Sequence, residues 1–389
     1  MNSIQDIAQA MVAKGKGILA ADESTPTCTK RFESINVEST EDSRNAYRDL
    51  LFTADGIENV AQAMVQKGKG ILAADESTPT CTKRFESINV ESTAKNRNAY
   101  RDMLFTAEGI ENHISGVILF DETIRQSTIN GSIPFPDHLS ALGIIPGIKV
   151  DKGAKQLANT DNEKITDGLD GLRDRLKEYY ELGARFAKWR AVITIGEDIP
   201  TAYCISANAH ALARYAALCQ EQELVPIVEP EILMDGDHTI EESYQLTIET
   251  LYTVFYELAS QGVSLEGMVL KPNMVMSGYD CSEQATVEDV AKMTVDCFLN
   301  TVPAAVPGIA FLSGGQSDEL ATAHLNAMNQ IDNTPWNLTF SYGRALQAPA
   351  LKIWSGKDEN VSNAQDAFMK RAKFNSLATK GEFSADMEN

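Results

Sequence analysis

The chain has 389 residues, of which 43% are hydrophobic, and a formal net charge of −21. This hydrophobic content is enough for a large core, and the length suits either two or three domains or a single α/β barrel, which spans roughly 200 to over 400 residues. The acidic charge argues against nonspecific nucleic-acid binding, but a local basic pocket can still accept an anionic small molecule.

The six cysteines form no C-x-x-C pair. In a chain that is not a small secreted scaffold, this pattern indicates free thiols in a reducing compartment. The first residues, "MNSIQDIAQAMV", have no basic segment followed by a long apolar core, so we expect no secretory signal. No run approaches the ~18 apolar residues of a membrane span. We therefore expect a cytoplasmic protein with no membrane partner.

The N-terminal part of the chain is repeated. Residues 7–59 align on residues 60–112 with seven differences among 53 positions. Repeat architectures need about three or more units of one period. Here the period occurs twice and does not recur, which favours a tandem duplication of one segment over a solenoid. We expect an extra N-terminal segment over residues 1–59 and a main domain over residues 60–389.

From the second copy onward, eight short apolar runs each end abruptly in polar residues. They cover residues 70–77, 115–122, 144–153, 184–190, 225–231, 267–273, 308–316 and 338–344. Near-continuous apolar runs are typical of parallel strands buried on both faces. Helical periodicity lies between several of them, at residues 168–183, 207–222 and 241–262. This alternation predicts an α/β fold, a (β/α)8 TIM barrel. A doubly wound open sheet is the alternative, but no G-x-G-x-x-G follows the first strand.

The barrel has one position for the strand "GILAA", and the two copies supply two candidates. Closure of a barrel fixes strand number, tilt and shear together. The second copy runs directly into the next strand, whereas the first copy would have to loop out 53 residues. We therefore predict that the second copy forms strand one, that Asp75 rather than Asp22 faces the active site, and that the first copy lies outside the barrel.

Polar residues at the C-terminal ends of barrel strands converge on one site. The candidates are Asp75 (or Asp22), Asp121, Lys149, Lys188, Arg190, Glu229, Glu231, Lys271, Ser313 and Arg344. A charge that follows a buried apolar run is costly unless it is paired. Any one of these residues could be a structural ion pair, but six or more at one end of successive strands favour chemistry.

The convergent set suggests Schiff-base chemistry on a lysine. None of the five histidines lies at a predicted strand end or forms a metal-binding motif, so we expect no metal and no cofactor. A lysine attacks a ketone as the neutral amine, and both desolvation and a second ammonium lower a lysine pKa. Lys271 has both if Lys188 lies opposite. Glu229 could then transfer protons, and Asp75 could hold the iminium or a substrate hydroxyl.

The last two strands indicate a phosphate site. "LSGGQS" and "SYGRAL" provide glycine amides together with Arg344. Barrels commonly bind phosphate at the loops after strands seven and eight, through backbone amides and a guanidinium. A glycine pair alone would be explained by a turn, so the pairing with Arg344 carries this prediction.

At this point the chain closely resembles class I fructose-bisphosphate aldolases. The matching motifs are "GKGILAADES", "GIKVDKG", "FAKWR", "VPIVEPEIL", "LEGMVLKPNMV", "FLSGGQS" and "SYGRALQAPAL". They span the chain from Val60 to about Leu377. The resemblance implies metal-free, reversible cleavage of fructose 1,6-bisphosphate to dihydroxyacetone phosphate and glyceraldehyde 3-phosphate, usually by a homotetramer.

The resemblance also implies roles for individual residues. Lys271 of "LKPNM" is the Schiff-base lysine, Lys188 assists it, Glu229 is the acid/base supported by Glu231, and Asp75 contacts the substrate. Substrate and phosphate binding fall to Ser77, Arg84, Lys149, Arg190, Ser313, Gly314, Ser341, Gly343 and Arg344. Among these, Ser313, Gly314, Gly343 and Arg344 are expected at one phosphate, and Ser77, Arg84 and Lys149 near the other end of the bisphosphate.

Two features depart from the family pattern. The first is the duplication. The second is the C-terminal stretch "KGEFSADMEN", because many eukaryotic members end in a tyrosine that aids proton exchange on the enamine, and no tyrosine follows Tyr342 here. Two alternative functions stay open at this stage. One is another Schiff-base lyase for sugar phosphates, and the other is a non-catalytic scaffold or binding protein on an aldolase fold.

Overall fold

The computed structural model describes residues 24–33, 37–41, 43–44 and 56–388. The chain divides into two compact units, Met1–Asp55 and Gly56–Asn389. The second unit begins at Gly56. The repeat alignment had predicted that the main domain begins at Val60.

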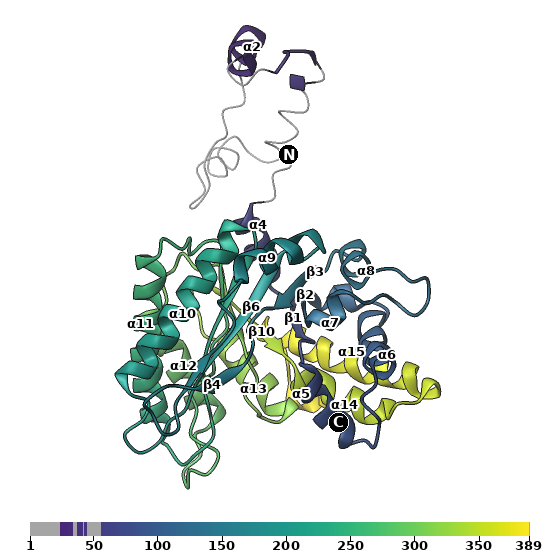
Figure 1. The fold of residues 1–389 in the computed structure, drawn as a ribbon. Coiled ribbons are helices and arrows are strands. Elements are labelled where there is room, and N and C mark those ends of the chain that lie inside the picture. Colours follow the sequence, from purple (N-terminus) through teal and green to yellow (C-terminus); the bar gives the residue numbers. More distant parts are fainter. Residues whose placement is uncertain (1–23, 34–36, 42, 45–55, 389) are drawn as a thin grey trace, which may run out of the picture. The chain divides into compact units, whose positions relative to one another are not determined.

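The second unit is a closed barrel of eight parallel strands surrounded by helices (Figure 1). The strands are β1 (Gly70–Ala73), β2 (Ile114–Leu119), β3 (Ile145–Lys149), β6 (Phe186–Ile193), β7 (Val225–Ile232), β8 (Val269–Leu270), β9 (Gly308–Phe311) and β10 (Asn337–Tyr342). Pairing of β1 with β10, with Ile71 opposite Ser341, closes the ring. The predicted (β/α)8 barrel is confirmed, and each predicted apolar run overlaps one barrel strand.

The helices follow the strands in the order expected of the fold. They are α5 (Thr78–Glu86), α6 (Ala94–Phe105), α7 (Asp121–Ile124), α8 (Phe135–Ala141), α9 (Leu172–Glu181), α10 (Ala202–Glu221), α11 (Ile240–Ser260), α12 (Val287–Thr301), α13 (Asp318–Asn329), α14 (Arg344–Trp354) and α15 (Val361–Ala378), with short 3₁₀ turns at Ile110–Asn112, Asp358–Asn360 and Ala385–Glu388. Helix α11 has a capping box between Thr239 and Glu242, which satisfies backbone donors at its start.

A short antiparallel hairpin lies outside the barrel and was missed from the sequence. It consists of β4 (Ala154–Gln156) and β5 (Lys164–Thr166). Strand β4 is exposed along its whole length. It therefore has no apolar run of the kind that identified the barrel strands.

Helix α4 (Ile57–Met64) explains why the second unit starts before Val60. Met64 and the following Val65 are fully buried in the cluster that fills the barrel interior, and Ile57 packs against that cluster. Ile57, Ala61 and Met64 lie on one helix face at helical spacing. Residues 57–59 end the first copy in the alignment, yet they form the first turn of this helix.

The first barrel strand comes from the second copy, as predicted. All eight strands of the closed barrel lie between residues 70 and 342. In the first copy, α2 (Thr25–Glu33) has the same nine residues as α5. Its Thr29 hydroxyl lies 2.9 Å from the Ser39 hydroxyl, and the equivalent distance between Thr82 and Ser92 is 2.8 Å. Asp22 and the first "GILAA" lie outside the described residues.

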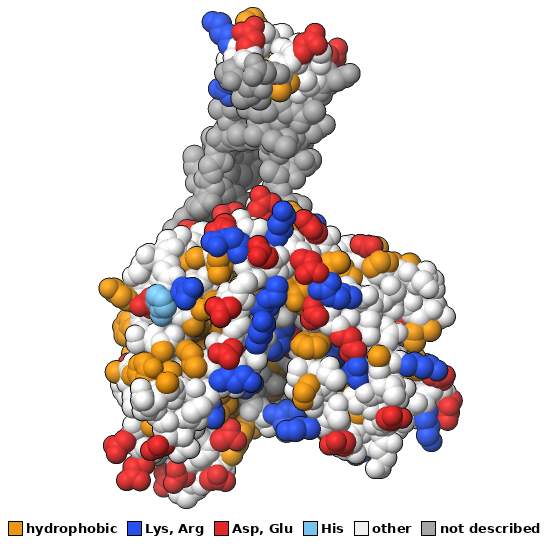
Figure 2. Space-filling view, viewed as in Figure 1, with side chains coloured by type: hydrophobic (Ala, Val, Ile, Leu, Met, Phe, Trp, Pro, Cys, Tyr) orange, Lys and Arg blue, Asp and Glu red, His pale blue; other side chains and the backbone are white. Residues whose placement is uncertain are grey.

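Acidic and basic side chains are interspersed on the face of the molecule shown in Figure 2. Among the described residues visible there, no broad basic surface is formed. Of the helices that the structure describes, none is long and apolar enough to cross a membrane.

A matched pair of glycine substitutions tests which copy fills the barrel. A Cβ atom at Gly70 would lie 2.5 Å from a ring carbon of buried Phe340. Overpacking of this kind costs about 1–3 kcal/mol. Gly70→Val should lower the free energy of unfolding by that amount, measured by urea denaturation. Gly17→Val, in identical local sequence, should leave it unchanged. Equal losses in both variants would contradict the assignment of strand one.

Candidate active site

The adjacent barrel strands β6 and β7 each carry two charged residues on the same face of the strand. Lys188 and Arg190 are two residues apart, as are Glu229 and Glu231, so each pair shares a side of its strand. Arg190 lies opposite Glu229 in the strand register. Both strands continue past these residues, to Ile193 and Ile232. The sequence pattern suggested that these charged residues follow the strands. In the structure they are part of the strands.

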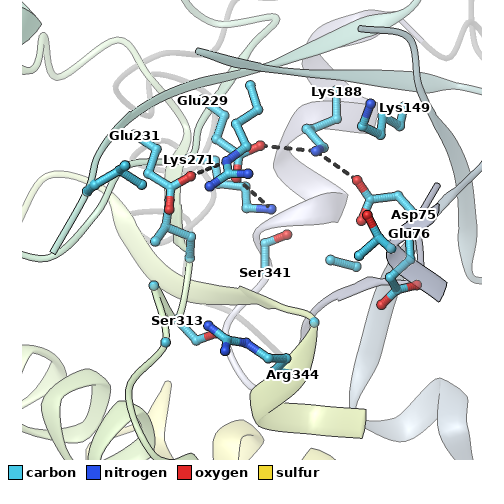
Figure 3. Close-up of a pocket in the computed structure, with 18 of the residues that line it drawn as sticks. Asp75, Glu76, Lys149, Lys188, Glu229, Glu231, Lys271, Ser313, Ser341 and Arg344 are labelled. Carbon is cyan, nitrogen blue, oxygen red and sulfur yellow. Dashed lines mark hydrogen bonds and ion pairs between the residues drawn. The ribbon is translucent and has the colours of Figure 1, made fainter. Parts of the chain in front are cut away.

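Four charged side chains form a continuous chain of contacts across the barrel (Figure 3). Lys271 Nζ lies 3.1 Å from Glu229 Oε1, and Lys188 Nζ lies 3.2 Å from Glu229 Oε2. Lys188 Nζ also lies 2.7 Å from Asp75 Oδ2. Lys188, Glu229 and Lys271 are each no more than 4% exposed. Glu229 therefore bridges the two lysines in a setting with little water.

Mutual pairing sets the charge states of Asp75, Glu229 and Lys188. Burial alone would raise the pKa of the Asp75 and Glu229 carboxyls, but Lys188 and Lys271 outweigh it and hold both pKa values below their ordinary range. Burial would likewise lower the pKa of Lys188, but Asp75 and Glu229 raise it instead. Lys188 is thus held as a cation, with the two carboxylates ionised beside it.

Two further ion pairs flank the central chain. The Arg190 guanidinium contacts Glu231, which is buried, and the pKa of Arg190 is raised mainly because that attraction outweighs burial. Lys149, at the end of β3, contacts the side chain and backbone carbonyl of Asp151. Lys149, Arg190 and Glu231 line the same pocket as the four central residues.

The loops after β9 and β10 form a glycine-rich rim. Gly314 has a φ of +62°, and a Cβ atom there would lie 2.5 Å from Met234 Sδ, so only glycine fits. Arg344 is exposed at the start of α14, and no ion pair of it occurs among the described residues. The buried Ser341 hydroxyl has no hydrogen-bond partner there either. These are groups free to bind an anion.

Arg84 reaches the rim from α5. Its guanidinium contacts the Glu76 carboxylate and donates to Gln347 Oε1 at 3.2 Å. It also lies 3.6 Å from the Cβ position of Gly343. These contacts place Arg84 beside the Gly343 rim, whereas the sequence interpretation grouped it with Lys149.

The structure brings all fourteen candidate residues with assigned roles to one cavity of about 490 Å³. They are Asp75, Ser77, Arg84, Lys149, Lys188, Arg190, Glu229, Glu231, Lys271, Ser313, Gly314, Ser341, Gly343 and Arg344. Among the residues that the structure describes, no group of three or more His, Cys, Asp or Glu side chains could hold a metal.

Asp121 was expected to converge with them and does not. Strand β2 ends at Leu119, and Asp121 begins helix α7, where it pairs with Arg125 at 3.0 Å. Its side chain is half exposed at 50%. Asp121 is thus the first residue of a helix, and its carboxylate pairs with an arginine of the same segment.

Sequence reasoning also missed several residues that line the cavity: Glu76, Thr80, Leu233, Asp235, Tyr279, Leu312 and Gly315. Glu76 and Gly315 are neighbours of residues that were chosen, so proximity in "ADES" and "SGGQ" was an available signal. Tyr279 lies in an irregular segment after β8, where no periodicity marks its direction.

Known proteins are similar to this chain over most of its length. A family model described as glycolytic fructose-bisphosphate aldolase class-I matches residues 3–60 and 56–389. A probable fructose-bisphosphate aldolase class 1 of Xanthomonas campestris is 61% identical over 325 residues, covering 83% of this chain and 97% of that protein. A cytosolic fructose-bisphosphate aldolase 4 of Arabidopsis thaliana is 56% identical, covering 82% of each.

A solved structure matches as well. It is a fructose-bisphosphate aldolase of Plasmodium falciparum, crystallised with TRAP and a small-molecule inhibitor. The TM-score is 0.83 at 52% identity, and the match covers 85% of this chain and 95% of that one. With a matched family model, a shared fold and more than half of the aligned residues identical, the chain belongs to the class I fructose-bisphosphate aldolase family.

Proposed function

We propose that this chain cleaves fructose 1,6-bisphosphate reversibly to dihydroxyacetone phosphate and glyceraldehyde 3-phosphate through a Schiff base on Lys271. The observation that carries the proposal is the series of contacts from Lys271 through Glu229 and Lys188 to Asp75. The first three of these side chains are buried. The names of the relatives support the substrate and the reaction.

The first steps use Lys271 and Glu229. The Lys271 amine adds to the C2 ketone, and loss of water leaves an iminium ion. Glu229, 3.1 Å from the Lys271 amine, moves the protons that addition and dehydration require. Lys188, held as a cation by Asp75 and Glu229, stabilises negative charge that develops on substrate oxygens.

Cleavage then breaks the bond between C3 and C4. A carboxylate takes the proton of the C4 hydroxyl, the C4 aldehyde leaves as glyceraldehyde 3-phosphate, and the bonding electrons form an enamine with the iminium. Protonation at C3 and hydrolysis release dihydroxyacetone phosphate and restore Lys271. We assign Asp75 to contact with substrate hydroxyls and Glu231, paired with Arg190, to support of Glu229.

The phosphates bind at the two sides of the cavity. We assign one phosphate to Ser313, Gly314, Ser341, Gly343 and Arg344, and the other end of the substrate to Lys149 and Ser77. Arg84 lies beside Gly343 and is available to the first group. Six cationic side chains line the cavity, namely Arg84, Lys149, Lys188, Arg190, Lys271 and Arg344. They suit a ligand with two phosphates even within an acidic protein.

The protein's wider setting is part of the same proposal. The cytosolic relative supports a cytoplasmic location, and the family resemblance supports a homotetramer that works without metal or cofactor. Tyr252, Tyr256 and Leu299 on α11 and α12 are large side chains left exposed and are available for contact between subunits.

Substitution of Lys271 tests the Schiff base. Lys271→Met should abolish both cleavage and borohydride trapping of the ketose phosphate, because the nucleophile is lost while side-chain volume is kept. Lys292→Met, at an exposed position on α12, should behave like the unmodified chain. Mass spectrometry and a coupled cleavage assay measure the two effects. Trapping absent in the unmodified chain would favour a scaffold.

The two copies allow a matched test of the catalytic aspartate. Asp75→Ala should lower kcat/KM at least about 100-fold, because it removes a partner of Lys188 2.7 Å away and an expected substrate contact. Asp22→Ala should leave kcat/KM unchanged. The reverse pattern, or equal partial losses in both variants, would refute the assignment of the working copy.

Arg344 tests the phosphate rim. Arg344→Ala should raise KM for fructose 1,6-bisphosphate about 10- to 100-fold, as expected when a hydrogen bond to a charged group is lost. The melting temperature should stay the same, since the side chain is exposed. Lys352→Ala, exposed on the same helix, serves as the control. An unchanged KM in the Arg344 variant would count against this role.

A further inference from the structure

Tyr279 has a fixed position at the cavity although it lies in irregular chain. Its backbone N–H donates to the Met234 carbonyl at 2.9 Å, and the N–H of Gly278 donates to the His238 carbonyl at 2.8 Å. A Cβ atom at Gly278 would lie 2.2 Å from the Gly236 carbonyl oxygen. The close packing of these two loops therefore needs glycine there, and it directs the Tyr279 ring toward the rim.

The Tyr279 hydroxyl meets the glycine rim beside Arg344. It donates to the Gly314 carbonyl at 3.3 Å and lies 3.5 Å from Met234 Sδ. From the Cβ position of Gly315, the Tyr279 hydroxyl is 3.4 Å away and an Arg344 guanidinium nitrogen 2.8 Å away. A phenol and a guanidinium thus converge on one point of the loop that was assigned to phosphate.

The contact to Gly314 is long and its acceptor is neutral, so it is easily exchanged. A phosphate oxygen is a stronger acceptor, because hydrogen bonds to ionised groups are shorter and roughly twice as strong. The side chain is 42% exposed, and its partial burial raises the pKa of Tyr279 against the opposing effect of Arg344, so the hydroxyl keeps its proton. It is a donor whenever the phosphate is charged.

We propose that the Tyr279 hydroxyl is a further ligand of the substrate phosphate at the Gly314–Arg344 rim, turning from the Gly314 carbonyl to a phosphate oxygen when substrate binds. This proposal rests on the proposed function and extends its phosphate site by one residue from the β8–α12 segment. The alternative is that Tyr279 only braces the rim through Met234 and Gly314.

Tyr279→Phe separates a ligand from a brace, because it keeps the ring and removes only the hydroxyl. We expect KM for fructose 1,6-bisphosphate and the inhibition constant of inorganic phosphate to rise about tenfold together. The value of kcat should stay within about twofold, as for a contact made equally in ground and transition states. Tyr203→Phe, at an exposed tyrosine on α10, should change neither constant.

Thermal unfolding distinguishes the two roles directly. A ligand role predicts an unchanged melting temperature without phosphate and a smaller rise when phosphate is added, since only bound ligand stabilises. A lower ligand-free melting temperature with an unchanged phosphate response would overturn the proposal. So would unchanged KM and inhibition constants in an active Tyr279→Phe variant. If the unmodified chain neither cleaves the substrate nor is trapped by borohydride, it is the proposed function that fails.

Discussion

The rest of the site depends on how Glu229 is shared between two buried lysines. An unpaired charge in a barrel interior would cost several kcal/mol or lose its ionisation. Here Lys271 and Lys188 each lie within 3.2 Å of one oxygen of the same carboxylate. Because Asp75 pairs with Lys188 on its other side, carboxyl groups and lysines alternate along the set of four residues. That alternation makes it feasible to keep both lysines out of water.

Closure of the barrel brings these four residues together from four different strands. Lys188 and Glu229 sit on the adjacent strands β6 and β7, Lys271 follows β8, and Asp75 follows β1 across the ring. The fully buried Gln347 stabilises the segment that contains Asp75 through two hydrogen bonds. Gln347 donates to the Ala73 carbonyl at 2.6 Å and accepts from Tyr100 at 2.9 Å. Glu76 pairs with both Arg84 and Arg101 nearby. The segment that carries Asp75 is therefore held by a contact to helix α14.

Sequence analysis identified the strands because parallel strands buried on both faces leave unbroken apolar runs. It identified Lys271 and Glu229 because charges rarely occur in such runs. The expectation that Asp121 joins the cavity was wrong, because a polar residue after a strand can equally begin a helix, as it does in α7. Tyr279 and Gln347 could not be found this way, because their roles come from contacts between segments far apart in sequence. The repeat alignment does not show that residues 57–59 belong to α4, because this follows from the packing of Ile57 against the buried cluster.

The near-identity of the two copies also bears on how this gene can change. Because the two copies are offset by 53 residues, removal of any 53 consecutive residues that start between positions 7 and 60 rejoins the chain in register as one hybrid copy. Every such hybrid keeps the aspartate, glutamate, serine and arginine that face the cavity, because the copies differ at none of these positions. Within the second copy, the substituted positions are exposed or half-buried, except Met103, which the first copy replaces with leucine. A single recombination event could therefore restore a one-copy barrel from many different breakpoints, each with the same cavity lining.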